Sequence, residues 1–293
     1  AEGLAPMDMR MEMNVKMNHL DQPDQLRLMS YSRVTVPGEE PITYSQYYLD
    51  GYMYADMLDL YGDSGNMEIL QYRCRMRGIP CEVDHYTRNM EVPDFSAYDL
   101  IYLGGGADLE QQILAEDLTR CKEGLRRAYA DGVFFLMICG GYQLMGQYYR
   151  DADGGTLPGV GLFDYYTIAP KDRRKRCIGN IVVQTMLTGK PLEVIGFENH
   201  GGQTSGITTP FGTVRCGNGN CFQSASEGYC EKNVIATYLH GPLLSKNPEL
   251  ADYILTYCLH RHPGTPAALE PLDDQLEQAC RAVMLKRLLK EKE

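Results

Sequence analysis

The sequence predicts an α/β domain of three layers, in which a mostly parallel sheet carries helices on both faces. From about Tyr44 onwards, short strand-like segments alternate with longer segments of helical periodicity. Two of the strand-like segments, DLIYL (99–103) and VFFLMI (133–138), are almost wholly apolar. Continuous apolar character is typical of strands that are buried on both faces of a parallel sheet.

The first half of the chain alternates strand and helix. Strand character, apolar or aromatic-rich, appears in four segments: 47–54, 79–86, 99–103 and 133–138. Helical periodicity appears in three segments: 67–77, 110–129 and 142–149. The polar turn LYGDSGN (60–66) suits the start of the first helix, and Gly78 suits its end.

The second half has more strand character. Four segments predict strands: VGLFDYYTIA (160–169), IGNIVVQT (178–185), EVIGFEN (193–199) and NVIATYLH (233–240). Two helices are then expected, over 248–260 and 275–290. The last helix becomes basic towards its C-terminal end, which the helix dipole favours.

The N-terminal residues differ in composition from the rest of the chain. Four methionines alternate there with charged or polar residues, and prolines and a glycine follow. We expect residues 1–42 to form a flexible tail and residues 43–293 to form one domain. The segment has no apolar core with a small-residue cleavage site, so we do not expect a signal peptide.

Charge and composition exclude several classes of function. The net charge of −11 argues against a general affinity for nucleic acid or anionic membranes. No apolar run approaches the roughly 20 residues that span a bilayer, so membrane insertion is not expected. The ten cysteines lack the density of a secreted disulfide scaffold, and we expect reduced thiols in a cytoplasmic protein.

Three cysteines lie close together around the loop CGNGNC: Cys216, Cys221 and Cys230. Their proximity raises the hypothesis of a zinc site. They include no C-x-x-C pair, and no fourth ligand is obvious nearby. We therefore expect no metal on this chain.

The most informative cysteine is Cys139, which follows the apolar strand 133–138 and precedes two glycines and a helix. A nucleophile at such a sharp strand-to-helix turn stands at the mouth of a sheet. The helix start favours a thiolate and offers backbone N–H groups to an oxyanion. Taken alone, however, Cys-Gly-Gly also fits a buried structural cysteine.

A nucleophilic cysteine needs a base. His240 ends the apolar segment NVIATYLH and would lie, like Cys139, at the carboxyl edge of the sheet, where open parallel sheets hold their sites. His200, in FENHGGQT, is a rival base. Spacing alone does not choose between them.

Five motifs resemble one known family. LYGDSGN, YLGGGAD, ICGGYQLMG, GFENHGGQT and TYLHGP occur in the order found in cobyric-acid-synthase-like class I glutamine amidotransferases. Among these, the set is most similar to the GatD-like glutaminase subunits of lipid II isoglutaminyl synthases. The resemblance covers about residues 45–285 and implies a class I amidotransferase domain with a flavodoxin-like sheet.

The resemblance implies roles for particular residues. Cys139 would attack the side-chain amide of glutamine and form a γ-glutamyl thioester, with His240 as the base. The backbone N–H of Gly140 and of one glycine in 104–106, taken as Gly105, would form the oxyanion hole.

Two more residues match substrate-binding positions of that family. Gln143 falls where the nucleophile motif places a substrate-contacting glutamine. Arg176 matches an arginine suited to the α-carboxylate of the substrate, which a guanidinium binds through two parallel hydrogen bonds. Arg176 equally fits a solvated basic run with its neighbours in KDRRKR.

One position departs from ordinary class I amidotransferases, which have an acid two residues after the histidine. Here that residue is Pro242. The resemblance implies that a partner subunit supplies the acid, so that the isolated chain is a poor glutaminase. Glu198 is the alternative within the chain.

The resemblance also implies a partner. This sequence has no G-x-x-x-x-G-K-[ST] loop for ATP phosphates, so no cofactor is expected here and ATP with Mg²⁺ is expected on the partner. That partner would be a Mur-ligase-like synthetase in a heterodimer, amidating the D-glutamate α-carboxylate of lipid II in peptidoglycan synthesis. An amidotransferase for another acceptor, such as a corrinoid, and a catalytically silent interaction subunit are the alternatives.

Overall fold

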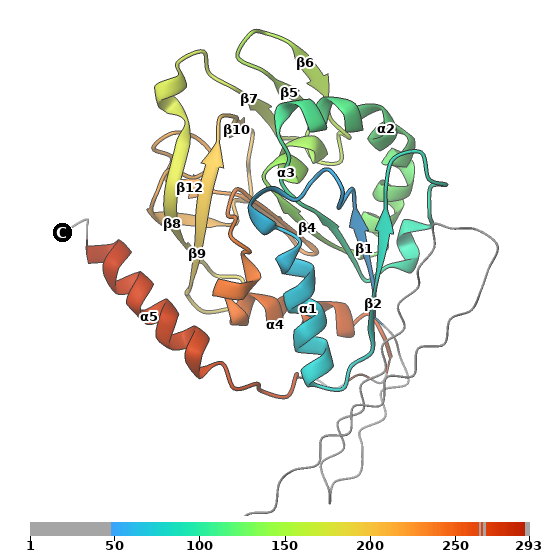
Figure 1. Cartoon of the computed structure of the whole chain (residues 1–293), viewed down its shortest axis with the longest axis vertical. Helices are drawn as coiled ribbons and strands as arrows, with labels where there is room; N and C mark the ends of the chain where they lie inside the picture. The colour runs from blue at the N-terminus through green and yellow to red at the C-terminus, as the bar shows by residue number, and fades with distance from the viewer. Residues whose placement is uncertain (1–47, 264, 266–267, 291–293) are drawn as a thin grey trace, which may run out of the picture. The chain divides into compact units, whose positions relative to one another are not determined.

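The computed structural model describes residues 48–263, 265 and 268–290 (Figure 1). The expected tail over residues 1–42, and the expected start of the domain at residue 43, lie outside the described residues. None of the helices in the described ranges is both long enough and apolar enough to cross a membrane.

A six-stranded sheet forms the centre of the described domain, in the order β13-β14-β4-β3-β1-β2. Its strands are β1 (Tyr48–Met53), β2 (Cys81–Tyr86), β3 (Leu100–Leu103), β4 (Phe134–Ile138), β13 (Tyr229–Glu231) and β14 (Val234–Thr237). All neighbouring pairs are parallel except β13 with β14. The expected mostly parallel sheet is confirmed.

Helices cover both faces of this sheet. They are α1 (Gly65–Met76), α2 (Asp108–Ala130), α3 (Gly140–Met145) and α4 (Pro248–Leu259). A fifth helix, α5 (Gln275–Lys290), contacts another sheet. The step from β1 to β2 and the step from β3 to β4 run in opposite directions across the sheet, so right-handed crossovers place α1 and α2 on opposite faces. Helix α4 packs against α1, and α3 packs against α2 (Figure 1). The three-layer prediction is thus confirmed.

Two four-stranded sheets accompany the central one, in the orders β10-β7-β5-β6 and β12-β11-β8-β9. The first contains β5 (Tyr148–Arg150), β6 (Thr156–Pro158), β7 (Tyr166–Ile168) and β10 (Gln203–Ser205). The second contains β8 (Cys177–Thr185), β9 (Leu192–His200), β11 (Gly212–Cys216) and β12 (Ser226–Glu227). The expected strands over 178–185 and 193–199 are confirmed as β8 and β9, whereas the division into separate sheets was not predicted.

The helix expected over 142–149 is only partly correct. Helix α3 ends at Met145, and the chain then enters strand β5. Gly146 has an extended backbone and lies so close to Tyr165 that a Cβ would stand 2.7 Å from its ring. Packing against a distant residue, which local periodicity does not report, ends this helix. The expected strand 160–169 is likewise shortened, to Tyr166–Ile168.

Glu227 is a fully buried carboxyl at the end of β12. It accepts hydrogen bonds from the backbone N–H of Tyr238 (2.7 Å) and from the hydroxyl of Thr237 (2.9 Å). Burial raises the pKa of Glu227 to about 8, which these hydrogen bonds offset only in part. The folded protein therefore holds this carboxyl protonated at pH values where the unfolded chain ionises it.

Glu227→Gln is expected to flatten the pH dependence of stability. In the wild type, the free energy of unfolding falls by a few kcal/mol as pH rises from the unfolded pKa of 4.5 to about 8, because the unfolded chain loses the proton first. Denaturant unfolding at pH 5 and pH 8 measures the slope. A residual slope is expected from Asp50, whose pKa burial also raises to about 8. The exposed Glu116→Gln is the control, and an unchanged slope in Glu227→Gln would contradict the assignment.

Candidate active site

Cys139 occupies the sharp turn between β4 and α3. Its φ of 49° lies in the left-handed region that side chains other than glycine rarely adopt. A Cβ on Gly141 would stand 2.6 Å from the Cβ of Leu103, and a Cβ on Gly140 would stand 2.8 Å from the backbone nitrogen of Gly106. The two glycines therefore let the turn pass close to β3 and the loop that follows it. This confirms the predicted strand–turn–helix around Cys139.

His240 lies three residues beyond the end of β14. Its backbone pairs with Phe197 of β9, through His240 N–H to Phe197 O (2.8 Å) and Phe197 N–H to His240 O (3.1 Å). The side chain of His240 is fully buried. Strand β9 thus fixes the histidine, although β9 belongs to another sheet.

Asp63 accepts a hydrogen bond from the imidazole of His240. Nδ1 of His240 lies 2.9 Å from Oδ2 and 3.1 Å from Oδ1 of Asp63, and both side chains are fully buried. The carboxylate also accepts the backbone N–H of Gly105 (2.9 Å). The hydroxyl of Tyr102 donates to the carbonyl of Asp63 (2.7 Å), which fixes the loop that carries it.

Cys139, His240 and Asp63 converge at Gly105. A Cβ built on this glycine would lie 2.7 Å from Cε1 of His240, 3.0 Å from Oδ2 of Asp63 and 3.5 Å from Cβ of Cys139. Any side chain at position 105 would therefore displace the three groups. Cys139 and His240 follow β4 and β14, Gly105 follows β3, and Asp63 lies in the connection between β1 and α1.

The electrostatics favour a charged imidazole. Burial alone would lower the pKa of His240, but the charge of the Cys139 thiolate and the hydrogen bond that the imidazole donates to Asp63 outweigh it and raise this pKa to about 10. A thiolate beside an imidazolium is the reactive form of a cysteine nucleophile. Nε2 of His240 has no hydrogen-bond partner among the described residues, so it is available to a reacting group.

Arg176 lies at the rim of this site and is exposed. Its Nε donates to Oδ1 of Asn199 (2.9 Å), and the amide of Asn199 in turn donates to the hydroxyl of Tyr61. The ring of Tyr61 packs edge-on against His240, with centroids 4.9 Å apart. A short chain of contacts therefore connects the guanidinium with the imidazole.

The family is established by comparison with known proteins. Residues 51–248 match the model of the CobB/CobQ-like glutamine amidotransferase domain. The chain belongs to this family. Two relatives carry the name lipid II isoglutaminyl synthase (glutamine-hydrolyzing) subunit GatD. The protein of Staphylococcus aureus (strain N315) is 36% identical, over 81% of this chain and 95% of its own length. That of Streptococcus pneumoniae (strain ATCC BAA-255 / R6) is 36% identical, over 78% of this chain and 86% of its own length.

A more distant relative is the cobyric acid synthase of Rhodobacter capsulatus. It is 32% identical over 50% of this chain, but that alignment covers only 31% of the synthase. The chain is thus a glutamine amidotransferase domain whose similarity to the GatD subunits extends over most of both proteins. The resemblance inferred from the five motifs is confirmed.

The acid that contacts His240 in this amidotransferase is Asp63, which was not among the expected candidates. Glu198, the alternative within the chain, does not contact His240. Its carboxylate accepts hydrogen bonds from Asn218 and Gly219 instead. An acid from a partner stays a prediction, although Asp63 of this chain already contacts Nδ1 of His240. Asp63 belongs to the motif LYGDSGN, which we interpreted only as a turn that starts a helix.

The expected oxyanion donor Gly105 is also corrected. Its N–H is already donated to Asp63, so it is not free for a substrate oxygen. The next glycine, Gly106, has its nitrogen beside Gly140, and no hydrogen bond of the described residues uses that nitrogen. Gly106 is therefore the better candidate for the second donor, and the expected role of Gly140 stays a prediction.

Gln143 and His200 both lie in the interior. The amide of Gln143 accepts from Gln111 (3.0 Å) and donates to the hydroxyl of Tyr238 (3.2 Å), so its expected contact with substrate stays a prediction. His200 stacks on the ring of Tyr238 with centroids 3.5 Å apart. The structure brings His240, and not the rival His200, to Cys139.

Proposed function

We propose that this chain is the glutaminase subunit of a lipid II isoglutaminyl synthase: it hydrolyses L-glutamine and delivers ammonia to a separate synthetase. The arrangement of Cys139, His240 and Asp63 carries this proposal, because it supplies a nucleophile, a base and an orienting acid in one buried cluster. The name of the two GatD relatives supports the choice of acceptor.

The reaction follows from the positions of the three side chains. The thiolate of Cys139 attacks the side-chain amide carbon of glutamine, and His240 gives its proton to the leaving ammonia. The γ-glutamyl thioester that results is then attacked by water, whose proton His240 accepts, and cleavage of the C–S bond releases glutamate and restores the Cys139 thiolate. Asp63 holds the imidazole with Nε2 directed at the reacting atoms and stabilises its positive charge in both steps.

Backbone N–H groups stabilise the negative oxygen that forms on the amide carbon in each step. Gly140 at the start of α3 and Gly106 after β3 are the two donors in this proposal. Because both belong to the backbone of buried glycines, they do not have to reorganise during the reaction.

Arg176 binds the α-carboxylate of glutamine in this proposal. Arg176→Lys is expected to raise KM for glutamine roughly 10- to 100-fold with little change in kcat, because lysine keeps the charge but loses the two parallel hydrogen bonds. Steady-state glutamate release measures both constants. Arg174→Lys, on a neighbouring exposed arginine paired with Asp172, is the control. A fall in kcat with unchanged KM would contradict this role.

The synthetase must be another polypeptide in this proposal. We expect a Mur-ligase-like partner in a heterodimer, where ATP and Mg²⁺ activate the D-glutamate α-carboxylate of lipid II and ammonia converts it to D-isoglutamine. Ten free thiols and a thiolate nucleophile suit the reducing cytoplasm, where the reaction would feed peptidoglycan synthesis. A corrinoid acceptor has less support, because the similarity covers under a third of the cobyric acid synthase.

The test combines labelling with turnover. The full chain is treated with acivicin, an electrophilic glutamine analogue, and the modified peptide is located by mass spectrometry; glutamate release is then measured with and without the candidate ligase. We expect labelling at Cys139, its suppression by excess glutamine, and amidated lipid II only when ligase and ATP are present. Absence of both labelling and release, with the ligase present, would favour a silent interaction subunit.

A further inference from the structure

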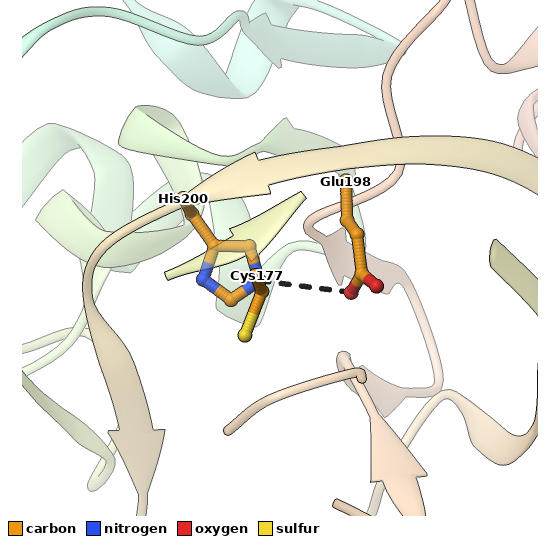
Figure 2. A group of neighbouring side chains, drawn as sticks. All are labelled: Cys177, Glu198 and His200. Carbon is orange, nitrogen blue, oxygen red and sulfur yellow. Dashed lines mark ion pairs between the residues drawn. The ribbon is translucent and has the colours of Figure 1, made fainter. Parts of the chain in front are cut away.

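A second cluster of metal-binding residue types lies outside the active site. Cys177 begins β8 and faces His200 at the end of β9, because the two residues are directly paired in the antiparallel register. Glu198 precedes His200 by two residues and so projects from the same face of β9. Figure 2 shows the three neighbouring side chains, with the ion pair between His200 and Glu198 drawn as a dashed line. Their ligand atoms all lie within 4.8 Å of one another.

The histidine in this cluster has one nitrogen in use and one without a partner. Nδ1 of His200 lies 2.7 Å from the carbonyl oxygen of Gly202, so this nitrogen carries the proton and donates it. Nε2 then presents its lone pair. It is buried, has no hydrogen-bond partner among the described residues, and lies 3.9 Å from Oε2 of Glu198. A carbonyl that fixes the opposite nitrogen is the usual support of a metal-bound histidine.

Glu198 has hydrogen bonds but little charge compensation. It is fully buried and accepts hydrogen bonds from the backbone and side chain of Asn218 and from the N–H of Gly219. Within the described residues, His200 is the only basic side chain that approaches its carboxylate within ion-pair distance. A buried carboxylate of this kind is stabilised by a cation.

We propose that Cys177, Glu198 and His200 bind a divalent transition-metal ion, with Zn²⁺ the best match. Thiolate, imidazole and carboxylate in one buried site suit zinc, which is held by four ligands in tetrahedral geometry. Such ligand atoms stand about 3.5 Å apart, so the three side chains would close in by roughly 1 Å on binding. The site is distinct from the zinc hypothesis built on Cys216, Cys221 and Cys230.

Two further residues, Gln203 and Cys221, bear on this metal site. The side-chain amide of Gln203 donates to the sulfur of Cys177 (3.8 Å), as supporting groups do around a metal-bound thiolate. Cys221 donates to the carbonyl of Thr204 (3.3 Å), the residue next to Gln203. The thiol of Cys221 is thus already used, so water would complete the four ligands and Cys221→Ser should leave the charge-transfer band of a Co²⁺ complex unchanged.

The consequence for the reaction rests on the proposed function. Arg176 directly precedes Cys177, and Asn199, its hydrogen-bond partner, lies between Glu198 and His200. A metal that joins the ends of β8 and β9 would therefore fix the guanidinium at the rim of the active site. Its removal is expected to raise KM for glutamine more than it lowers kcat.

Metal binding is tested on the full chain carrying Cys139→Ala, so that the nucleophile cannot act as a ligand and glutaminase activity is not the readout. Titration with Co²⁺, followed by Zn²⁺ competition, is expected to show one equivalent bound and a thiolate-to-cobalt charge-transfer band. Cys177→Ser should remove the band, and His200→Gln should weaken binding by about 100-fold or more. The exposed Cys280→Ser should leave both unchanged.

Two results of the titration would overturn the proposal. One is the absence of a charge-transfer band in a chain whose far-ultraviolet circular dichroism shows it folded. The other is a band that survives Cys177→Ser, which would place the ion elsewhere. A doubly protonated His200 ring at neutral pH, seen by nitrogen NMR with Zn²⁺ present, would instead identify a simple ion pair with Glu198. Each outcome leaves the glutaminase proposal standing, because Cys139 takes no part in the measurement.

Discussion

Cys139→Ala is expected to lower kcat for glutamate release by at least about 10⁴-fold, to the limit of detection. The thioester cannot form without the sulfur, and neither His240 nor the backbone N–H groups can replace a missing nucleophile. The loss is expected with and without the ligase partner, since the partner supplies no second nucleophile in the proposed reaction. Steady-state kinetics and single-turnover assays with labelled glutamine measure it.

The interpretation of Cys139→Ala depends on an intact binding site. Glutamine affinity, measured by calorimetry, is expected to change little, because binding in the proposed function relies on Arg176 and the surrounding backbone. The melting temperature is also expected to stay close to that of the wild type, since alanine leaves only a small gap. Cys280→Ser, on the exposed face of α5, controls for loss of a thiol. Measurable turnover in Cys139→Ala would contradict the assignment of the nucleophile.

Asp63→Asn is expected to lower kcat by roughly 10² to 10⁴-fold while leaving glutamine binding nearly intact. An asparagine in this place can present its amide to Nδ1 and favour the wrong tautomer, and it no longer stabilises the imidazolium. The exposed Asp56→Asn, on the same connection between β1 and α1, is the control. Circular dichroism and melting temperature establish that both variants fold.

The pH profile of Asp63→Asn separates an orienting role from a purely structural one. The Asp63 carboxylate is one of the groups that raise the pKa of His240 to about 10. Removing this negative charge lowers that pKa, so the imidazolium is lost at lower pH and the alkaline limb of kcat against pH moves down. A kcat that falls without movement of that limb would indicate that Asp63 acts only on the fold.

The partner offers a further comparison for the same variant. If the ligase restores the activity of Asp63→Asn to the wild-type level, the partner supplies the acid, as the family resemblance implied from Pro242. If the rate stays low in the complex, the acid belongs to this chain. Measuring both proteins with and without ligase distinguishes these cases.

The central sheet, Cys139 and His240 could be predicted from the sequence because each depends on a local pattern of residues. Strands β3 and β4 are continuous apolar runs, and Cys139 and His240 follow such runs directly. Asp63 was missed because its partner lies 177 residues away, and only the folded sheet brings the connection after β1 close to the residues that follow β14. The local sequence of the polar turn that contains Asp63 does not show whether its carboxylate contacts a histidine.

The other misses have the same physical origin. Gly105 is suited by sequence to an oxyanion hole, and only the position of Asp63 shows that its N–H is already used. The early end of α3 depends on the ring of Tyr165, and the cluster of Cys177 with His200 depends on the register of β8 and β9. Each is a contact between segments whose separate patterns do not specify how they pair.

The position of β14 in the strand order has a consequence for biosynthesis. β14 pairs directly with β4, yet it is translated long after it, when the intervening sheets have already left the ribosome. Until then the nascent chain exposes the edge of β4, an apolar strand open to pairing with other chains. His240 comes with that late strand, so the incomplete polypeptide carries its thiol without its base. The order of translation thus delays glutamine hydrolysis until β14 has joined the central sheet.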